Sequence, residues 1–183
     1  MKAKGSFFVG RRTFIVERFG EERWKQFVIK LGAEHKAFAQ PILVTSLVPV
    51  EDYALFQEAV AREFFDGDEQ SFWLMGEAAA KWALVDGPYA ALGRDKDYKG
   101  ILAKLPLVWT MYFTDGRLDV ADHGTHASFH IVGNRLPHIS VEYAVMGFAR
   151  KALEMVGKKP KTQKRLRGVK DGDGSDVQYE FWF

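Results

Sequence analysis

Apolar residues recur at helical spacing through roughly the first 113 residues of the chain. In residues 21–32, Trp24, Phe27, Val28 and Leu31 fall at i, i+3, i+4 and i+7, which places them on one helix face. Similar spacing predicts helices over residues 13–19, 49–64, 72–85 and 98–113. Residues 5–9 are apolar but too few to distinguish a strand from the approach to the first helix. The N-terminal part is therefore predicted to be helical.

After residue 113 the period changes from 3.6 to 2, which is typical of strands. Strands are predicted over residues 117–122 and 125–132, followed by an amphipathic helix over 140–156. Two last strands, 161–169 and 177–183, are joined by an Asp-Gly-Asp-Gly turn, a strong hairpin signal. The order β-β-α-β-β after a helical half predicts an α+β fold with an antiparallel sheet. We expect one domain over residues 1–183, with a helical subdomain (1–115) and a sheet subdomain (116–183).

Composition excludes several classes of protein. The chain has 183 residues, 14% aromatics, a net charge of +2 and no cysteine, so disulfides, thiolate metal sites and cysteine nucleophiles are excluded. The N-terminus lacks the pattern of a signal peptide, and no apolar run approaches the roughly 20 residues that span a bilayer. We expect a cytoplasmic protein that does not bind membranes.

The stretch from residue 98 to residue 130 predicts either the wall of a buried pocket or an ordinary helix-on-sheet core. A bulky apolar helix precedes a strand that carries histidines, and the small residues 76–80 would let a neighbouring helix or a ligand approach closely. If a pocket is present, we expect the residues that line it to be Trp82, Leu105, Trp109, Tyr112, His126 and His130.

Three of the five histidines, His123, His126 and His130, lie close together in the sequence. On a strand, His126 and His130 would be about 13 Å apart, at roughly 3.3 Å per residue, which is too far to share one metal ion. We therefore expect no metal site. The simplest interpretation is histidines on a sheet face with local hydrogen bonds; the alternative is a histidine that faces a pocket and contacts an anionic ligand.

The charged segments offer no clear partner or catalytic site. Seven basic residues lie between positions 158 and 170, but Pro160 interrupts them and no aromatics are interleaved, so we expect no nucleic-acid partner. Arg11 and Arg12 are too short a run to indicate more than solvated charge. The acidic turn at 171–176 lacks the glutamate of a calcium loop. No serine has a nucleophile-elbow setting and no nucleotide-binding glycine motif is present, so we expect no enzymatic activity.

Several loose motifs carry a resemblance to a known group of folds. They are the F-G-E-E-R-W run of residues 19–24, similar to the F-G-E-x-x-W that joins two helices in that group, the helix over 51–64, the helix that contains Gly76, the apolar run 102–109 and the terminal β-β-α-β-β order. Over nearly its whole length, the chain resembles the haem-NO/oxygen-binding (H-NOX) fold and its haem-free relatives. These include the 4-vinyl-reductase-type ligand-binding domains and an uncharacterised family best represented in myxobacteria. The resemblance implies a helical half packed on the sheet.

The haem chemistry of the group does not carry over to this sequence. The haem-binding members place the ligating histidine in an L-x-x-L-H run, and the matching residues 105–109 end in Trp109. An indole has no basic lone pair and cannot ligate iron. Their Y-x-S-x-R motif, which holds the haem propionates, is matched at residues 131–135 by Arg135 alone. We therefore expect no cofactor.

The sequence and the resemblance together favour a haem-free bacterial sensor or signalling domain that binds a small apolar or aromatic molecule between its two halves. The alternative is a protein-interaction or dimerisation scaffold with a filled core, since relatives of the 4-vinyl-reductase type include trafficking components that pair as dimers. The partner would then be a second copy or a signalling protein. Neither hypothesis requires a catalytic residue.

Overall fold

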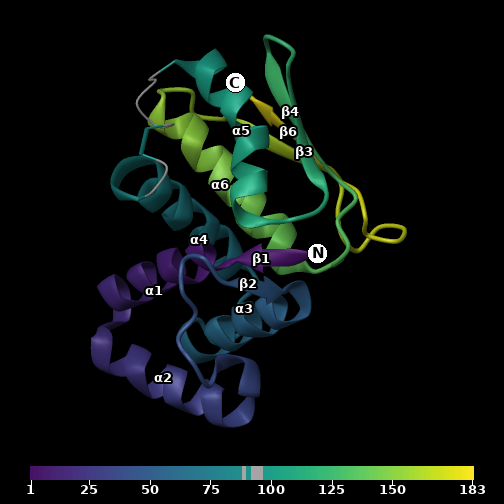
Figure 1. Ribbon diagram of the computed structural model, residues 1–183. Helices are drawn as coiled ribbons and strands as arrows, with labels where there is room; N and C mark the ends of the chain where they lie inside the picture. The colour runs from purple at the N-terminus through teal and green to yellow at the C-terminus, as the bar shows by residue number, and fades with distance from the viewer. Residues whose placement is uncertain (88–89, 92–96) are drawn as a thin grey trace.

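The computed structural model describes residues 1–87, 90–91 and 97–183, and it places a helical body against an antiparallel sheet (Figure 1). The helical part contains α1 (Gly5–Phe19), α2 (Glu21–Glu34), the 3-10 turn η1 (Lys36–Phe38), α3 (Val50–Phe64), α4 (Gln70–Lys81), the π-helical turn η2 (Trp82–Asp86) and α5 (Tyr98–Tyr112). The sheet part contains β3 (Arg117–Asp122), β4 (His126–Val132), α6 (Ile139–Met155), β5 (Thr162–Arg167) and β6 (Val177–Trp182). The predicted α+β class is confirmed.

The sheet has the strand order β3-β4-β6-β5, with every neighbouring pair antiparallel. Alternation along β4 and β6 puts one set of side chains on the face that packs against the helices, and this set is buried: Ala127, Phe129, Ile131, Val177, Tyr179 and Phe181. The other face is partly open to solvent. The predicted terminal hairpin is confirmed, because β5 and β6 pair with each other around the turn.

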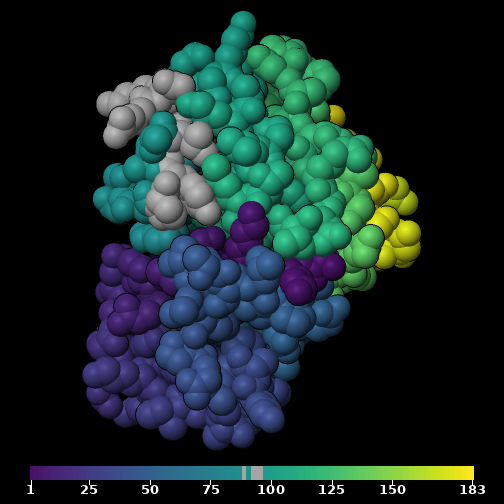
Figure 2. All heavy atoms as spheres, viewed as in Figure 1, coloured from purple at the N-terminus to yellow at the C-terminus, as the bar shows by residue number. Residues whose placement is uncertain are grey.

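The N-terminal segment connects the start of α3 with the end of α5 through two short strands that the sequence did not indicate. Strand β1 (Lys2–Lys4) pairs with β2 (Leu47–Pro49), and Ala3 also forms an isolated bridge with Phe113 after α5. The backbone N–H of Thr114 donates to the carbonyl of Lys2 at 3.0 Å. In Figure 2 these N-terminal residues lie along the seam between the α1–α3 body and the rest of the molecule. These backbone contacts fix the position at which α1 begins.

Helices α4 and α6 pack so closely that the backbone of each contacts the backbone of the other. A Cβ atom added to Gly76 would lie 2.2 Å from the carbonyl oxygen of Ala144, and one added to Gly147 would lie 2.3 Å from that of Trp73. Real Cβ atoms do not approach so closely, so only glycine fits at either position. Of the two roles expected for the small residues of this helix, the approach of a neighbouring helix is therefore the one the structure shows at Gly76.

A buried carboxylate joins α6 to the sheet. Glu142 is fully buried and accepts hydrogen bonds from Arg165 Nε (2.6 Å), the Tyr179 hydroxyl (2.6 Å) and the backbone N–H of Val169 (2.7 Å). Burial and the hydrogen bond to Glu142 raise the pKa of Tyr179 well above its usual range. The hydrogen bond to Glu142 also raises the pKa of Arg165. Because its partners satisfy the carboxylate, the network anchors the otherwise exposed strand β5.

We predict that Gly76→Ala destabilises the protein. In an exposed helix this change is worth up to about 1 kcal/mol of stabilisation, because alanine has the higher helix propensity. Here the added methyl group must separate α4 from α6, and overpacking of this kind costs about 1–3 kcal/mol. Urea unfolding followed by circular dichroism measures the difference. The control is Ala78→Gly on the same helix, which should lose only about 1 kcal/mol of propensity; a stabilised Gly76→Ala protein would contradict the tight crossing.

Candidate functional site

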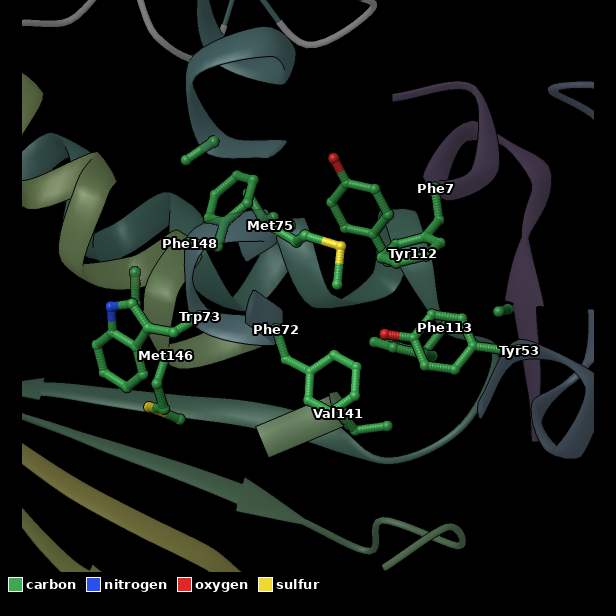
Figure 3. Close-up of a cluster of buried hydrophobic side chains, with 14 of the residues drawn as sticks. Phe7, Tyr53, Phe72, Trp73, Met75, Tyr112, Phe113, Val141, Met146 and Phe148 are labelled. Carbon is green, nitrogen blue, oxygen red and sulfur yellow. The ribbon is translucent and has the colours of Figure 1, made fainter. Parts of the chain in front are cut away.

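The space between the helical half and the sheet contains a small apolar cavity, which we call the inter-half cavity. Its volume is about 40 Å³, and since one water needs about 10–15 Å³ of such space, it has room for roughly three. Figure 3 shows buried side chains of this region, among them the lining aromatics Phe7, Tyr53, Tyr112, Phe113 and Phe148. The lining residues come from α1, α3, α4, α5, β3, α6 and the residue after α5: Phe7, Tyr53, Gly76, Ala79, Leu105, Val108, Trp109, Tyr112, Phe113, Leu118, Ala144, Val145, Phe148 and Ala149.

The structure brings three of the six predicted pocket residues together at this cavity. Leu105, Trp109 and Tyr112 lie on consecutive turns of α5 and all three contribute to its wall. Trp82 packs instead against α1, where its ring would lie 2.8 Å from a Cβ atom added to Gly10. That an apolar ligand contacts Leu105, Trp109 and Tyr112 stays a prediction.

Trp109 is held in place by contacts on both its polar and its apolar side. The side chain is buried, and its indole Nε1 donates to the carbonyl of Asp115 at 3.1 Å. Its ring packs on that of Phe113, with the centroids 4.7 Å apart. Since the one N–H donor of the indole is already used within the protein, Trp109 offers a ligand only apolar surface.

His126 and His130 lie on the face of the sheet that points away from the helices, because they alternate with the buried residues of β4. His126 stacks between His123 (4.5 Å between centroids) and Trp182 (4.3 Å). His130 Nε2 lies 3.4 Å from Gln178 Nε2. Neither histidine lines the inter-half cavity, and no group of three metal-binding side chains occurs in residues 1–87, 90–91 and 97–183. The interpretation as sheet-face histidines with local contacts fits this geometry.

A larger cavity lies in the helical half, between α1, α2 and the segment that follows α2; we call it the α1–α2 cavity. Its volume is about 570 Å³. The cavity is open to solvent at its edge, where lining residues such as Ile29, with 74% of its surface accessible, are exposed. Apart from Arg12 and Gln40 the lining is formed by apolar residues and one glycine: Phe8, Val9, Trp24, Val28, Ile29, Leu31, Gly32, Phe38, Ala39, Pro41, Ile42 and Phe56. The sequence analysis did not predict this cavity.

The expectation that Arg11 and Arg12 are both solvated is wrong for Arg11. Arg12 is exposed and forms an ion pair with Glu21, in which Nη2 donates to both carboxylate oxygens at 2.9 Å. Arg11 is 2% exposed, and its guanidinium lies behind the wall of the inter-half cavity, with Cζ 4.9 Å from the centroid of the Phe7 ring. Desolvation lowers its pKa to about 10, which still leaves it protonated at neutral pH. The helix spacing of Arg11 with Phe7 and Ile15, both buried, was the signal that could have indicated this.

The fold is shared with solved structures. No family model matches the sequence, and the curated proteins contain no match. An H-NOX protein from S. oneidensis in the Fe(II)NO ligation state superposes with a TM-score of 0.74 at 9% identity, over 98% of this chain and 99% of that one. An Fe(II) unliganded H-NOX protein from K. algicida gives a TM-score of 0.68 at 14% identity, over 98% and 95%. The chain has an H-NOX-like fold.

At identities this low, the structural similarity establishes the H-NOX-like fold alone. The ligand of these proteins is therefore not inferred for this chain. Trp109, which the resemblance alone matches to a ligating histidine, lies near the end of α5 and lines the inter-half cavity. No histidine is among the residues that line this cavity in the described part of the chain. Arg135, the one residue retained from the propionate motif, is exposed after β4. No helix within residues 1–87, 90–91 and 97–183 combines the length and hydropathy needed to cross a membrane.

We predict that Trp109→Ala destabilises the protein by about 3–5 kcal/mol, as expected when a large aromatic side chain is removed from a packed core. The change removes the contact with Phe113 and leaves the carbonyl of Asp115 without its donor. Guanidinium unfolding measures the loss. Leu107→Ala on the same helix is the control, because Leu107 is 48% exposed and its truncation should cost much less. Similar values for the two variants would show that the region around Trp109 is not packed as described.

Proposed function

We propose that this chain is a haem-free domain of the H-NOX-like fold that binds a small apolar molecule in the α1–α2 cavity. The observation that carries the proposal is the volume and chemistry of that cavity. At about 570 Å³ it lies within the range of about 300–1,000 Å³ that is common for ligand sites. Its walls are apolar almost throughout, so the favourable free energy of binding would come chiefly from burial of apolar surface.

The polar groups at this cavity suggest that the ligand is neutral or only weakly polar. Of the two polar lining residues, Arg12 already has a carboxylate partner in Glu21, and Gln40 is exposed at the edge. No nucleophile is paired with a base among the residues that line the cavity, which supports a binding role rather than a catalytic one. A long-chain or polycyclic apolar molecule fits this site better than a charged metabolite does.

The inter-half cavity supports the haem-free part of the proposal. A space of about 40 Å³ is far smaller than a tetrapyrrole, and its lining in the described residues offers no imidazole or thiolate for iron. Trp109, which occupies the ligating position by resemblance, is committed to Asp115 and Phe113. Binding haem would require the core to be rebuilt around it.

A scaffold function is the second candidate, and one observation favours it. A scaffold needs the volume between the halves to be filled by protein side chains, and most of that volume is filled. Leu43, Val44 and Leu47, which precede α3, are 51–64% exposed and would suit contact with a protein partner such as a second copy of the chain. The α1–α2 cavity favours ligand binding over this alternative, and the ligand experiment below separates the two.

We predict that the purified protein is colourless and does not bind added haem stoichiometrically. The reason is that the position matched by resemblance to the ligating histidine carries an indole, and that the cavity beside it, at about 40 Å³, is too small for a tetrapyrrole. Absorbance between 350 and 450 nm during a haem titration, followed by gel filtration, provides the measurement. The proposal that the domain is haem-free would be refuted by a sharp Soret band that saturates at one equivalent and remains with the protein.

We predict that Val28→Trp abolishes binding of apolar ligands, because an indole at this position would occupy the α1–α2 cavity. Native mass spectrometry of freshly purified protein identifies any retained molecule, and displacement of a fluorescent apolar dye gives affinities for a panel of fatty acids, alcohols and sterols. The control is Lys25→Trp, which adds the same side chain at an exposed position of α2 outside the cavity. It should bind as the wild type does.

The result has two informative alternatives. Equal binding by the two tryptophan variants would place the apolar site elsewhere in the molecule. No retained molecule and no dye binding by the wild type, together with a concentration-dependent dimer in analytical ultracentrifugation, would favour the scaffold.

A further inference from the structure

The buried guanidinium of Arg11 has no acidic partner among the described residues. Its Nε donates to Gln57 Oε1 at 3.2 Å, while Nη2 is buried and makes no hydrogen bond. Gln57 in turn donates to the hydroxyl of Tyr53 at 3.2 Å. Burial has the largest effect on the pKa of Arg11, and the phenols of Tyr53 and Tyr112 follow it; neither of these groups is a carboxylate.

The phenols do not neutralise this charge at neutral pH. Burial raises the pKa of Tyr53 to about 12, so its hydroxyl is protonated, whereas Arg11, with a pKa of about 10, is charged. The folded protein therefore holds a net positive charge among α1, α3 and α5. Burial of an unpaired charge is strongly unfavourable, and buried charges in proteins are as a rule paired or metal-bound. The charge of Arg11 therefore lacks a compensating anion among the described residues.

A purely structural role accounts for only part of this geometry. The cation–π contact with Phe7 involves one face of the guanidinium, and the bond to Gln57 involves its Nε. Neither uses Nη2. An oxyanion at Nη2 would satisfy the donor and the charge together, since guanidinium groups bind carboxylates through such N–H donors.

We propose that Arg11 anchors a small monocarboxylate ligand whose short apolar tail occupies the inter-half cavity. The charge of one carboxylate matches the charge of the Arg11 guanidinium. A cavity of about 40 Å³, equivalent to roughly three waters, limits the tail to about three carbon atoms, as in propionate or butyrate. Phe7 contacts the guanidinium and also lines the cavity, so Arg11 and the cavity are separated by this one side chain.

This anion site is distinct from the α1–α2 cavity and does not depend on the proposed function. Arg11 and Phe7 lie on the buried face of α1, whereas Phe8, Val9 and Arg12 line the α1–α2 cavity. Binding at one site can therefore be lost while binding at the other persists. The Val28→Trp variant described above should retain the response to carboxylates.

The test compares carboxylates with their uncharged amides. Thermal melting is measured for the wild type with acetate, propionate, butyrate and hexanoate, with the matching amides, and with nitrate and phosphate, at constant ionic strength and pH 7. The two variants are Arg11→Met and Arg12→Met, which remove adjacent arginines of which one is buried and one exposed. Isothermal titration calorimetry then gives the dissociation constant for the acid that produces the largest shift.

We expect propionate or butyrate at ten times its dissociation constant to raise the wild-type melting temperature by about 3–6 °C. The matching amide should bind at least tenfold more weakly, and hexanoate, which exceeds the cavity, should bind more weakly than butyrate. Arg12→Met should keep this preference and Arg11→Met should lose it. Without ligand, Arg11→Met should melt at or above the wild-type temperature, because an unpaired buried charge has been removed.

Three results would overturn the proposal. The first is an absence of any preference for acids over amides in the wild type, which decides the matter even if Arg11→Met fails to fold. The second is an equal response to nitrate or phosphate, which would show that the site does not select carboxylates. The third is a preference that survives in Arg11→Met. None of these results would contradict ligand binding in the α1–α2 cavity. Conversely, an absence of dye binding by the wild type would contradict only the proposed function of that cavity.

Discussion

The backbone contact between α4 and α6 determines how closely the two halves of the molecule approach each other. At Gly76 and Gly147 each helix packs directly on the peptide groups of the other, with no room for a side chain between them. Helix α6 is fixed to the sheet through Glu142, and α4 precedes α5, whose residues line the inter-half cavity. The two glycines thus let α4 and α6 approach closely, and this limits the space that the two halves enclose.

Helix α1 is the element that both proposed binding sites share. Phe8 and Val9 line the α1–α2 cavity, whereas Phe7 lines the inter-half cavity and contacts Arg11. A ligand can shift a conformational equilibrium only by the difference in its affinity for the two states. An apolar ligand that displaces α1 would change the surroundings of Arg11, so the proposed binding of a carboxylate and of an apolar ligand would be coupled reciprocally. Melting shifts measured with both ligands present would give the size of that coupling.

Local pattern predicted the longer elements well because their periodicity is set by burial on one face. The strand predicted over residues 117–122 has these bounds in the structure, and the helix predicted over 98–113 ends one residue earlier. The first helix was underestimated, since α1 begins at Gly5 where the short apolar run was ambiguous. Strands β1 and β2 were missed because each has three residues and their pairing joins positions about 45 residues apart. A local pattern carries no information about such a contact.

The candidate sites were harder to predict because they depend on which face of an element meets the core. Period-2 alternation showed that His126 and His130 share a face of β4, but it could not show that the opposite face packs on the helices. The α1–α2 cavity is a gap between helices, and no residue pattern encodes a gap. Arg11 and Arg12 are adjacent and chemically identical, yet one is buried and the other is paired with Glu21 in solvent. Helical geometry separates them by about 100° around the axis, so one arginine had to face inward once Phe7 and Ile15 did, and its charge entered the core with it.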